Sequence, residues 1–224
     1  MAITMKDFET EMKQSFQLLG CAQLHDAAMQ YSTYLKISLT TRTSIKKLAG
    51  PVFPVITDND MLPCLQALDA APTGSVLFVQ NQSGKSEALA GDIFVTAAKQ
   101  QGLEGLIVNG AVRDIDVIEN MGFPVFSNSV TFVSAKTAKA ASAAIPATVV
   151  LDGIELEPMD WIFADSDGVL LIKKKYMKTV YKAAMMLRNR EEDLRQRIAG
   201  GERLSDLCGL HDFVAGKAEL KFEA

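Results

Sequence analysis

The chain has 224 residues, of which 48% are hydrophobic and 22% are charged, a balance that excludes disordered, collagen-like and coiled-coil proteins. It carries 23 basic and 27 acidic residues, a formal net charge of −4, and so lacks the basic excess that binding along a nucleic-acid backbone requires. Its 3 cysteines and 2 histidines are isolated from one another, which disfavours a zinc cage and favours chemistry by carboxylates, arginine and backbone groups.

The N-terminal part of the chain, residues 1–46, is predicted to be helical. Apolar residues from Met5 to Gln30 recur at roughly helical spacing with a break at Gly20, so we expect two helices. No apolar h-region follows a basic start. No apolar run reaches the roughly 18 residues that a transmembrane helix needs. We therefore expect a cytoplasmic protein with no membrane partner and no nucleic-acid partner.

The middle of the chain, residues 47–175, is predicted to form a sheet and its covering helices. Two prolines punctuate the apolar run from Leu48 to Ile56, which favours a strand near a sheet edge because proline lacks a ladder donor. From Gly74 to Phe126, apolar strands alternate with helical segments, which is typical of a parallel or mixed sheet flanked by helices. Short strands around Asp152-Gly153 and around Asp165 to Gly168 then predict hairpins.

The details of the alternating section set the position of the candidate chemistry. A helix is predicted from Asp92 to Gln101 and a buried strand from Leu103 to Val108. We expect a tight turn at Gly110 and a short helix from Ile115 to Met121.

Residues 176–224 are predicted to form a C-terminal helical extension. The segment from Tyr176 to Ala199 is amphipathic and rich in charged residues, and Gly200-Gly201 is a stop signal. No low-complexity linker divides the chain, so we expect a single domain, residues 1–224. The extension would then be free to pack on a neighbouring subunit.

The stretch from residue 91 to residue 114 carries the strongest chemical signal. The first turn of its predicted helix comprises Gly91, Asp92, Ile93 and Phe94. Free backbone N–H groups at a helix start favour an anion such as a carboxylate. Arg113 and Asp114 follow the C-terminal end of a buried strand, where open α/β sheets bind ligands. Together they offer a fork for a carbonyl or carboxylate oxygen and an oxygen ligand for a divalent cation.

A purely structural interpretation of the same residues is also open. Asp114 suits the N-cap of a helix that begins at Ile115, and Arg113 can pair with an acid elsewhere. One carboxylate makes only a partial metal site. Any metal here would therefore be a water-rich Mg²⁺ or Mn²⁺ completed by substrate oxygens.

Four segments resemble the RraA-like family, which includes regulator of ribonuclease activity A and the class II 4-hydroxy-4-methyl-2-oxoglutarate/4-carboxy-4-hydroxy-2-oxoadipate aldolases. The segments are Gly91-Asp92, Ala98 to Gly105, Gly110 to Asp114 and Gly122 to Phe126. Weaker similarities lie at Gly50 to Phe53 and at Asp165 to Val169. The resemblance covers most of the chain, with the C-terminal helix matched only loosely.

The resemblance implies an α/β fold, an α-β-β-α sandwich of the swivelling β/β/α type, here with a C-terminal helical extension. It implies homotrimers or homohexamers with active sites between subunits. In the aldolase branch, the residues matching the substrate contacts are Gly91, Asp92, Ile93, Phe94 and Arg113, and the residue matching the metal ligand is Asp114. An acid on the C-terminal helix of the adjacent subunit also contributes in that branch, and our candidate for this catalytic role is Glu191, with Glu192 as the alternative.

The activity that the resemblance implies is a divalent-metal-dependent lyase that cleaves a short α-keto acid to pyruvate, as an aldolase, an oxaloacetate decarboxylase or both. Cleavage beyond the keto group leaves a pyruvate enolate, whose charge a metal and the Arg113 guanidinium would stabilise. The alternative is a non-catalytic regulator that binds a ribonuclease or another protein. The intact Arg113-Asp114 pair and the long C-terminal helix favour the enzyme.

Two positions depart from the family pattern. Asn109 stands where many members have Asp, and we expect it to lie beside the proposed metal and to shift substrate preference. Met159 stands in place of the glycine of a common Pro-Gly-Asp turn, and we expect it to alter that turn.

Overall fold

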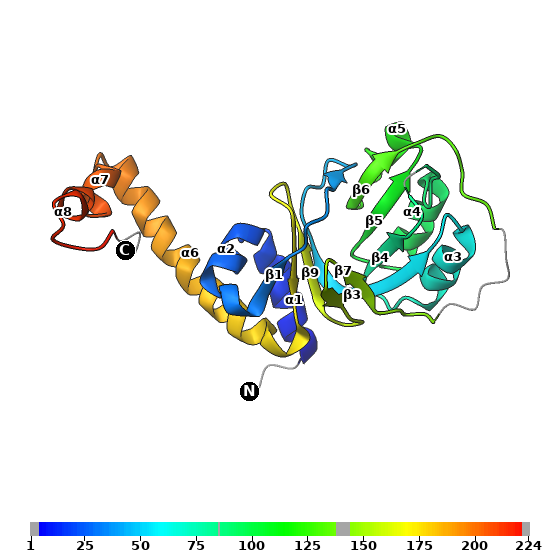
Figure 1. Cartoon of the computed structure of the whole chain (residues 1–224), viewed down its shortest axis with the longest axis horizontal. Coiled ribbons are helices and arrows are strands. Elements are labelled where there is room, and N and C mark those ends of the chain that lie inside the picture. Colours follow the sequence, from blue (N-terminus) through cyan, green and yellow to red (C-terminus); the bar gives the residue numbers. More distant parts are fainter. Residues whose placement is uncertain (1–4, 85, 138–143, 221–224) are drawn as a thin grey trace.

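Eight strands form one mixed sheet in the part of the chain that the structure describes, residues 5–84, 86–137 and 144–220. In this computed structural model the strand order is β1-β10-β9-β3-β4-β5-β6-β2, and β7 pairs with β8 in a separate hairpin (Figure 1). The strands are β1 Ser32–Tyr34, β2 Thr40–Thr41, β3 Leu48–Thr57, β4 Val76–Asn81, β5 Gly105–Val112, β6 Val125–Val130, β7 Val149–Leu151, β8 Ile154–Leu156, β9 Trp161–Ala164 and β10 Val169–Ile172. The helices are α1 Met5–Phe16, α2 Cys21–Ala27, α3 Met61–Ala70, α4 Asp92–Gln100, α5 Ile115–Ile118, α6 Met177–Ala199, α7 Leu204–Leu207 and α8 Leu210–Val214.

The strand β3 joins two halves of the sheet. Residues 48–51 pair antiparallel with β9, whereas residues 52–57 pair parallel with β4. The prediction that this segment lies near a sheet edge is therefore wrong. Its prolines are tolerated because neither removes a ladder bond. Pro51 precedes the first residue paired with β4. The backbone of Pro54 faces away from β4, where its carbonyl accepts from the Ala147 N–H.

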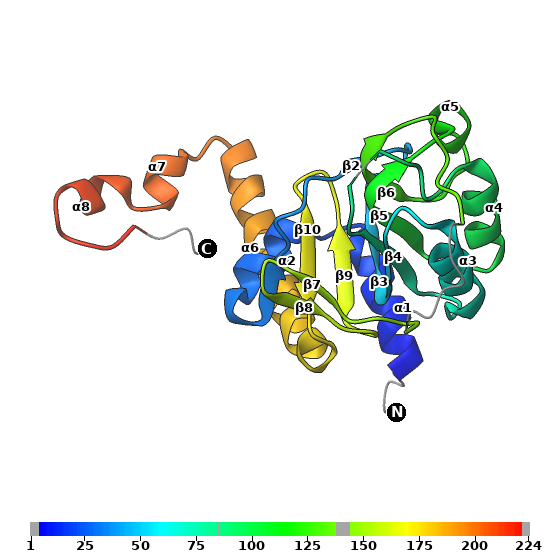
Figure 2. The ribbon, with the colours of Figure 1, turned by 45° about the vertical axis from the view of Figure 1, so that its right-hand side comes forward.

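Three buried clusters separate four layers of secondary structure, and the alternation of side chains along the strands sets them apart. In β4, Leu77 and Val79 face α3 and α4. The neighbouring Val76 and Phe78 face the other half of the sheet. The third cluster lies between β9, β10 and the helices α1, α2 and α6. Figure 2 shows these layers in the order helix, sheet, sheet, helix. The predicted α-β-β-α sandwich is confirmed.

The alternating section also agrees with prediction in its order of elements, because β4, α4, β5, α5 and β6 follow one another as expected. The expected tight turn at Gly110 is wrong, because this residue lies inside β5. The strand continues through an irregularity between Val108 and Ala111, where its pairing with β6 shifts. Gly110 also allows a close approach, since a Cβ there would lie 3.1 Å from the Asn81 Cβ.

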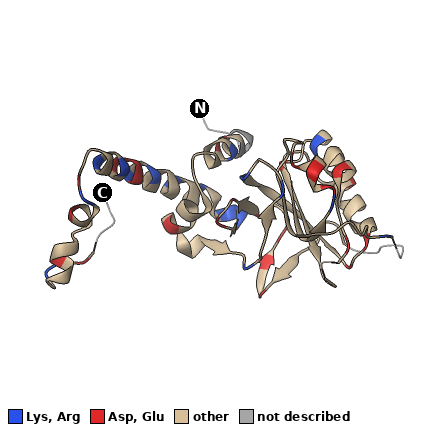
Figure 3. Ribbon diagram, turned by 90° about the horizontal axis from the view of Figure 1, so that it is seen from above, with Lys and Arg blue, Asp and Glu red and all other residues tan. Residues whose placement is uncertain are grey.

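Both ends of the chain extend this core. The two predicted N-terminal helices are present as α1 and α2, and Gly20 separates them. The segment 1–46 also contributes the short strands β1 and β2, which were not expected. The predicted C-terminal helix is α6, which carries α7 and α8 away from the sandwich (Figure 1). Figure 3 shows basic and acidic residues interspersed along it. Within the described segments, no helix is both long enough and apolar enough to cross a bilayer.

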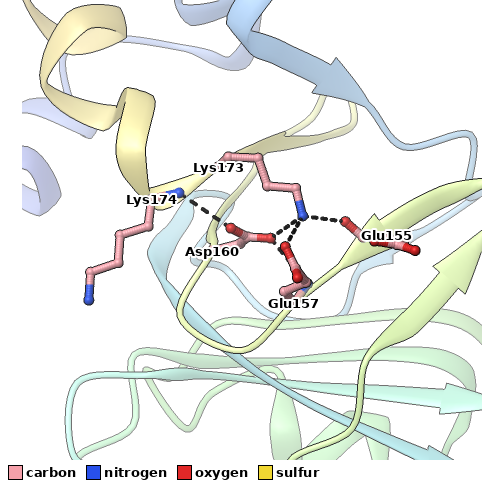
Figure 4. Close-up of polar contacts among 5 residues, drawn as sticks. All are labelled: Glu155, Glu157, Asp160, Lys173 and Lys174. Carbon is pink, nitrogen blue, oxygen red and sulfur yellow. Dashed lines mark hydrogen bonds and ion pairs between the residues drawn. The ribbon is translucent and has the colours of Figure 1, made fainter.

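A network of charged groups fixes the start of α6 to the loop before β9 (Figure 4). The Lys173 ammonium lies 2.8 Å from Asp160 Oδ2 and 2.6 Å from Glu157 Oε2. Asp160 is buried and also accepts from the backbone N–H groups of Glu157 and Lys174. Burial alone lowers the pKa of Lys173, but the hydrogen bonds and charges of the two carboxylates raise it overall.

Candidate active site

The segment just before α4 and the end of β5 lie side by side because backbone hydrogen bonds join them. The Leu89 N–H donates to the Ala111 carbonyl at 3.0 Å, and the Arg113 N–H donates to the Ala90 carbonyl at 3.0 Å. The predicted helix start is confirmed, with Gly91 as its N-cap residue. The two parts of the 91–114 motif are therefore adjacent in space.

Arg113 and Asp114 form an ion pair at this junction. Arg113 Nε lies 3.1 Å from Asp114 Oδ2, and the two side chains are 37% and 34% exposed. The Asp92 N–H donates to the same Oδ2 at 3.4 Å. Among the residues that the structure describes, Asp114 Oδ1 has no hydrogen-bond partner. The pair is thus held in place while one carboxylate oxygen remains available to a ligand.

The backbone of Asp114 adopts the left-handed conformation, with φ 60° and ψ 39°. Its carbonyl accepts from the first turn of α5, but its side chain makes no capping hydrogen bond. Asp114 therefore occupies the expected N-cap position of the helix that begins at Ile115, but it caps the helix through its backbone carbonyl, and its side chain instead pairs with Arg113. A residue with a Cβ in this conformation costs roughly 1–2 kcal/mol, and such conformations cluster at functional sites.

The absence of a side chain at Gly91 is required by this pair. A Cβ on Gly91 would fall well inside contact distance of Asp114 Oδ2, and it would lie 3.0 Å from Arg113 Cγ and Nε. Gly91 has an extended backbone, so packing rather than its own conformation imposes the requirement. The Gly-Asp start of α4 and the Arg-Asp end of β5 are therefore parts of one packed arrangement.

The backbone N–H groups at the start of α4 already have carboxylate neighbours within the chain. The Asp92 N–H points to Asp114, and the Ile93 N–H donates to Asp92 Oδ1 at 2.8 Å. The side chain of Ile93 is 78% exposed, whereas that of Phe94 is buried in the core under α4. Phe94 can therefore face a ligand only through its backbone, and an incoming carboxylate must compete with Asp92.

A hollow of about 700 Å³ lies in front of the ion pair. Its polar lining includes Asp92, Arg113, Asp114 and Asp116, so one cation faces three carboxylates. Its rim includes Phe132, whose side chain is 90% exposed. Sequence reasoning did not single out Asp116 or Phe132. Asp116 could have been found from its position two residues after Asp114. No sequence signal pointed to Phe132.

The donor set of this hollow fits a hydrated divalent cation better than a preformed cage. Within the described ranges, no three His, Cys, Asp or Glu side chains gather as a metal site. The groups at hand are the carboxylates of Asp114 and Asp92, and hard oxygen ligands suit Mg²⁺ or Mn²⁺. Water and substrate oxygens would complete the coordination.

The other predicted residues lie elsewhere in the chain. Glu191 is on α6, where its Oε2 accepts from Gln23 Nε2 at 2.5 Å and lies 3.4 Å from Arg195 Nη1. Glu192 is exposed on the same helix, and hydrogen bonds from Gln196 and Arg195 lower its pKa. In Figure 1, α6 and α5 lie on opposite sides of the sandwich. One chain therefore does not bring either glutamate to Arg113.

Asn109 also lies away from Asp114. It donates to Gln80 Oε1 at 2.9 Å and lines a different hollow, together with Lys36 and Asp152. The expectation that Asn109 lies beside the proposed metal is not met within the chain. Side-chain alternation along β5 explains this, because Asn109 follows the direction of Ile107 between the sheet halves rather than that of Val108.

Comparison with known proteins gives one family match. The family model described as RraA-like, Aldolase/RraA, matches residues 21–171, which include the whole 91–114 motif. A protein of Halalkalibacterium halodurans named "Putative 4-hydroxy-4-methyl-2-oxoglutarate aldolase" is 26% identical over 194 residues. That alignment covers 86% of this chain and 90% of that protein.

Solved structures with similar folds include two with different descriptions. An uncharacterized protein from Pseudomonas syringae pv. tomato aligns with a TM-score of 0.74 at 23% identity, over 88% of this chain and 96% of that one. The RNA-processing inhibitor RraA from Thermus thermophilis aligns with a TM-score of 0.62 at 24% identity, over 68% of this chain and 91% of that one. At these identities the likeness establishes the fold.

Proposed function

The chain belongs to the RraA-like family, and from this premise we propose that it is a divalent-metal-dependent lyase that cleaves a short α-keto acid to pyruvate. The proposed substrates are 4-hydroxy-4-methyl-2-oxoglutarate, after the name of the relative from Halalkalibacterium halodurans, and oxaloacetate. Aldol cleavage of the first and decarboxylation of the second both release the pyruvate enolate, so one site serves both.

The observation that carries the proposal is the ion pair of Arg113 and Asp114 at the start of α4. Arg113 is fixed through Nε at 3.1 Å from Asp114, which leaves its terminal N–H groups directed to other acceptors. These groups would donate to the carboxylate or keto oxygen of the substrate. Because they are held before the substrate binds, they stabilise the negative charge that develops on the keto oxygen.

Asp114, with Asp92 beside it, would hold the cation, through the Asp114 Oδ1 that has no partner in the described chain. When bound, a divalent cation supplies a Lewis acid that stabilises the developing enolate charge. The exposed ring of Phe132 at the rim would limit the access of water once a substrate or a neighbouring subunit covers it.

We propose in addition that copies of the chain associate as a homotrimer or homohexamer. The lining of the hollow exposes the apolar side chains of Val117, Val130 and Phe132, which are 53%, 49% and 90% exposed. Such an assembly would bring Glu191 of the partner subunit to the hollow as the acid that exchanges a proton with the substrate.

The experiment is a pyruvate-release assay on both substrates, with Mg²⁺ and with a chelator. Asp114→Ala is expected to lower kcat/KM by about 100-fold or more, because the cation loses its ligand. The matched control is Glu119→Ala, an exposed acid five residues later that lies outside the hollow, and it is expected to keep the parent rate. Equal rates for the two variants contradict the assignment of the site.

The same assay distinguishes the two candidate acids on α6. Glu191→Gln is expected to lower kcat, and Glu192→Gln to leave it close to the parent value. The reverse order would assign the role to Glu192 instead. If the parent chain turns over neither substrate, with or without Mg²⁺, a non-catalytic regulator is favoured.

A further inference from the structure

A second hollow lies on the opposite side of the molecule from Arg113, between α2 and β10. It has a volume of about 310 Å³, which is at the small end of ligand sites. We call it the α2–β10 hollow. Its walls include the apolar residues Cys21, Val169 and Leu170, and its polar groups include His25, Tyr34 and Asp167. The proposed lyase chemistry uses none of these residues.

The imidazole of His25 is held in one orientation by the neighbouring strand. Its Nδ1 lies 2.8 Å from the Ser32 hydroxyl, which donates its own proton to the Ala28 carbonyl at 3.3 Å. We assign the Nδ1–H tautomer to His25, because the hydroxyl has a single proton and the Ala28 carbonyl can only accept. The neutral ring then presents the lone pair of Nε2, which has no partner among the described residues.

Two further acceptors face the same space. The side chain of Tyr34 is exposed, and its hydroxyl has no partner within the described chain. The Tyr34 ring packs against Gly168, where a Cβ would lie 3.0 Å from the ring and where φ is +148°. The Asp167 carboxylate is likewise unpaired, since only its backbone N–H is engaged, with Asp165 Oδ1 at 2.9 Å. A carboxylate, a phenol and an imidazole nitrogen therefore surround a small apolar space.

The charge of the lining restricts what can bind. The residues that line the α2–β10 hollow include one carboxylate and no lysine or arginine. An anionic ligand is therefore disfavoured, and a ligand that donates hydrogen bonds is favoured. The Cys21 thiol provides apolar wall rather than a nucleophile, because burial and the nearby Asp165 raise its pKa far above the ordinary value.

From this geometry we propose that the α2–β10 hollow binds a small primary ammonium compound with a short aromatic or aliphatic body. The ammonium group would donate to His25 Nε2, the Tyr34 hydroxyl and the Asp167 carboxylate. The body would lie against Val169 and Leu170. Three acceptors match the three donors of an ammonium group, and the volume limits the body to a few carbon atoms or one ring.

Benzylamine is the probe, and NMR of the full chain labelled with ¹⁵N-histidine is the measurement. The chain contains only 2 histidines, and His211 is exposed on α8, so it serves as an internal reference. The titration is carried out at about pH 8, where the benzylamine amine is largely protonated. We expect a saturable shift of the His25 resonances with benzylamine, no shift of those of His211, and no response of either to benzoate.

Two variants that each remove one carboxylate make the test specific. Asp167→Asn is expected to weaken the affinity for benzylamine by about fivefold or more. Asp26→Asn removes an exposed carboxylate next to His25 that does not line the hollow, and it is expected to keep the parent affinity. An equal response to benzoate, an equal affinity in the two variants, or a non-saturable shift of both histidines would overturn the proposal. Pyruvate release is expected to be unchanged in Asp167→Asn, so this test and that of the lyase can fail separately.

Discussion

Gly91 and Asp114 are constrained in opposite ways in the candidate active site. Gly91 has an ordinary backbone and no room for a side chain, whereas Asp114 keeps a side chain in a left-handed backbone. The ion pair between Asp114 and Arg113 compensates for these two constraints. Asp114 is the N-cap residue of α5, but its side chain pairs with Arg113 rather than capping the helix, and this favours a ligand site.

Gly91→Ala tests directly whether position 91 must lack a side chain. The new methyl group would meet only side-chain atoms of Arg113 and Asp114, both partly exposed, and would push them out of their ion pair, so the fold is expected to survive. We expect pyruvate release to fall by about tenfold or more, because the reacting groups are misplaced. Gly20→Ala is the control, since its Cβ would only touch Asp165 Oδ2 at 3.3 Å, far from the site. Parent-like activity of Gly91→Ala would refute the packing argument.

Met159 is a second non-glycine residue in the left-handed region, with φ 72° and a side chain that is 37% exposed. Replacing it with glycine removes the steric cost of the Cβ, and Met159→Ala, which loses the same side chain but keeps the Cβ, is the matched comparison. Met159→Gly is expected to have a free energy of unfolding about 0.5–1 kcal/mol above that of Met159→Ala, measured by urea denaturation. A glycine variant less stable than the alanine variant would contradict this account of the backbone.

Among single residues, the sequence predicted which ones meet at the candidate site but not their surroundings. The spacing of Gly91, Arg113 and Asp114 is local and readable. The exposure of Phe132 and the direction of Asn109 depend on which face of β5 and β6 meets the other half of the sheet. That pairing is made by segments distant in the sequence, so no local pattern carried it.

Among the elements, β3 shows most clearly where local reasoning fails. Its prolines favour a position near a sheet edge, but the strand lies in the middle of the sheet because it changes partners from β9 to β4 along its length. By contrast, the order from β4 to β6 followed from periodicity and turn residues alone. Pairing between consecutive elements was predictable, whereas pairing between β3 and the much later β9 was not.

The loop before β9 is held to α6 by two carboxylates on one lysine, and burial distinguishes them. The side chain of Asp160 is 7% exposed and that of Glu157 is 53% exposed. Asp160→Ala is expected to lower the free energy of unfolding by about 2–3 kcal/mol, because two backbone N–H groups lose their acceptor and the Lys173 ammonium loses its buried partner, keeping only Glu157 and the Glu155 carbonyl. Glu157→Ala is expected to cost much less. Equal urea midpoints for the two variants would contradict this account of the network.

The same network predicts the direction of a pH dependence. A hydrogen bond from Lys173, and then its charge, lower the pKa of Glu157 in the folded chain. Its stabilisation is therefore present above the unfolded pKa of roughly 4.3 and is lost as pH falls through the folded value. The difference in unfolding free energy between the parent and Glu157→Ala should shrink on acidification. A difference that grows below that pH would reverse the sign of the interaction.

At the scale of the whole molecule, the two ends of the chain have different surroundings. Helices cover both faces of the sandwich, whereas α7 and α8 project from it and expose Leu204, Phe213 and Val214 (Figure 1). The rim of the candidate active site is exposed and apolar as well. Two such surfaces on one chain are typical of a subunit, and the proposed assembly would cover both.

We propose that this chain releases pyruvate in a metal-dependent reaction. The test is the steady-state rate of pyruvate formation by the full chain from oxaloacetate and from 4-hydroxy-4-methyl-2-oxoglutarate, with Mg²⁺ and again with excess EDTA. We expect turnover of at least one substrate that EDTA abolishes and added Mg²⁺ restores. Absence of pyruvate above the uncatalysed rate with either substrate, or a rate that EDTA leaves unchanged, would contradict it.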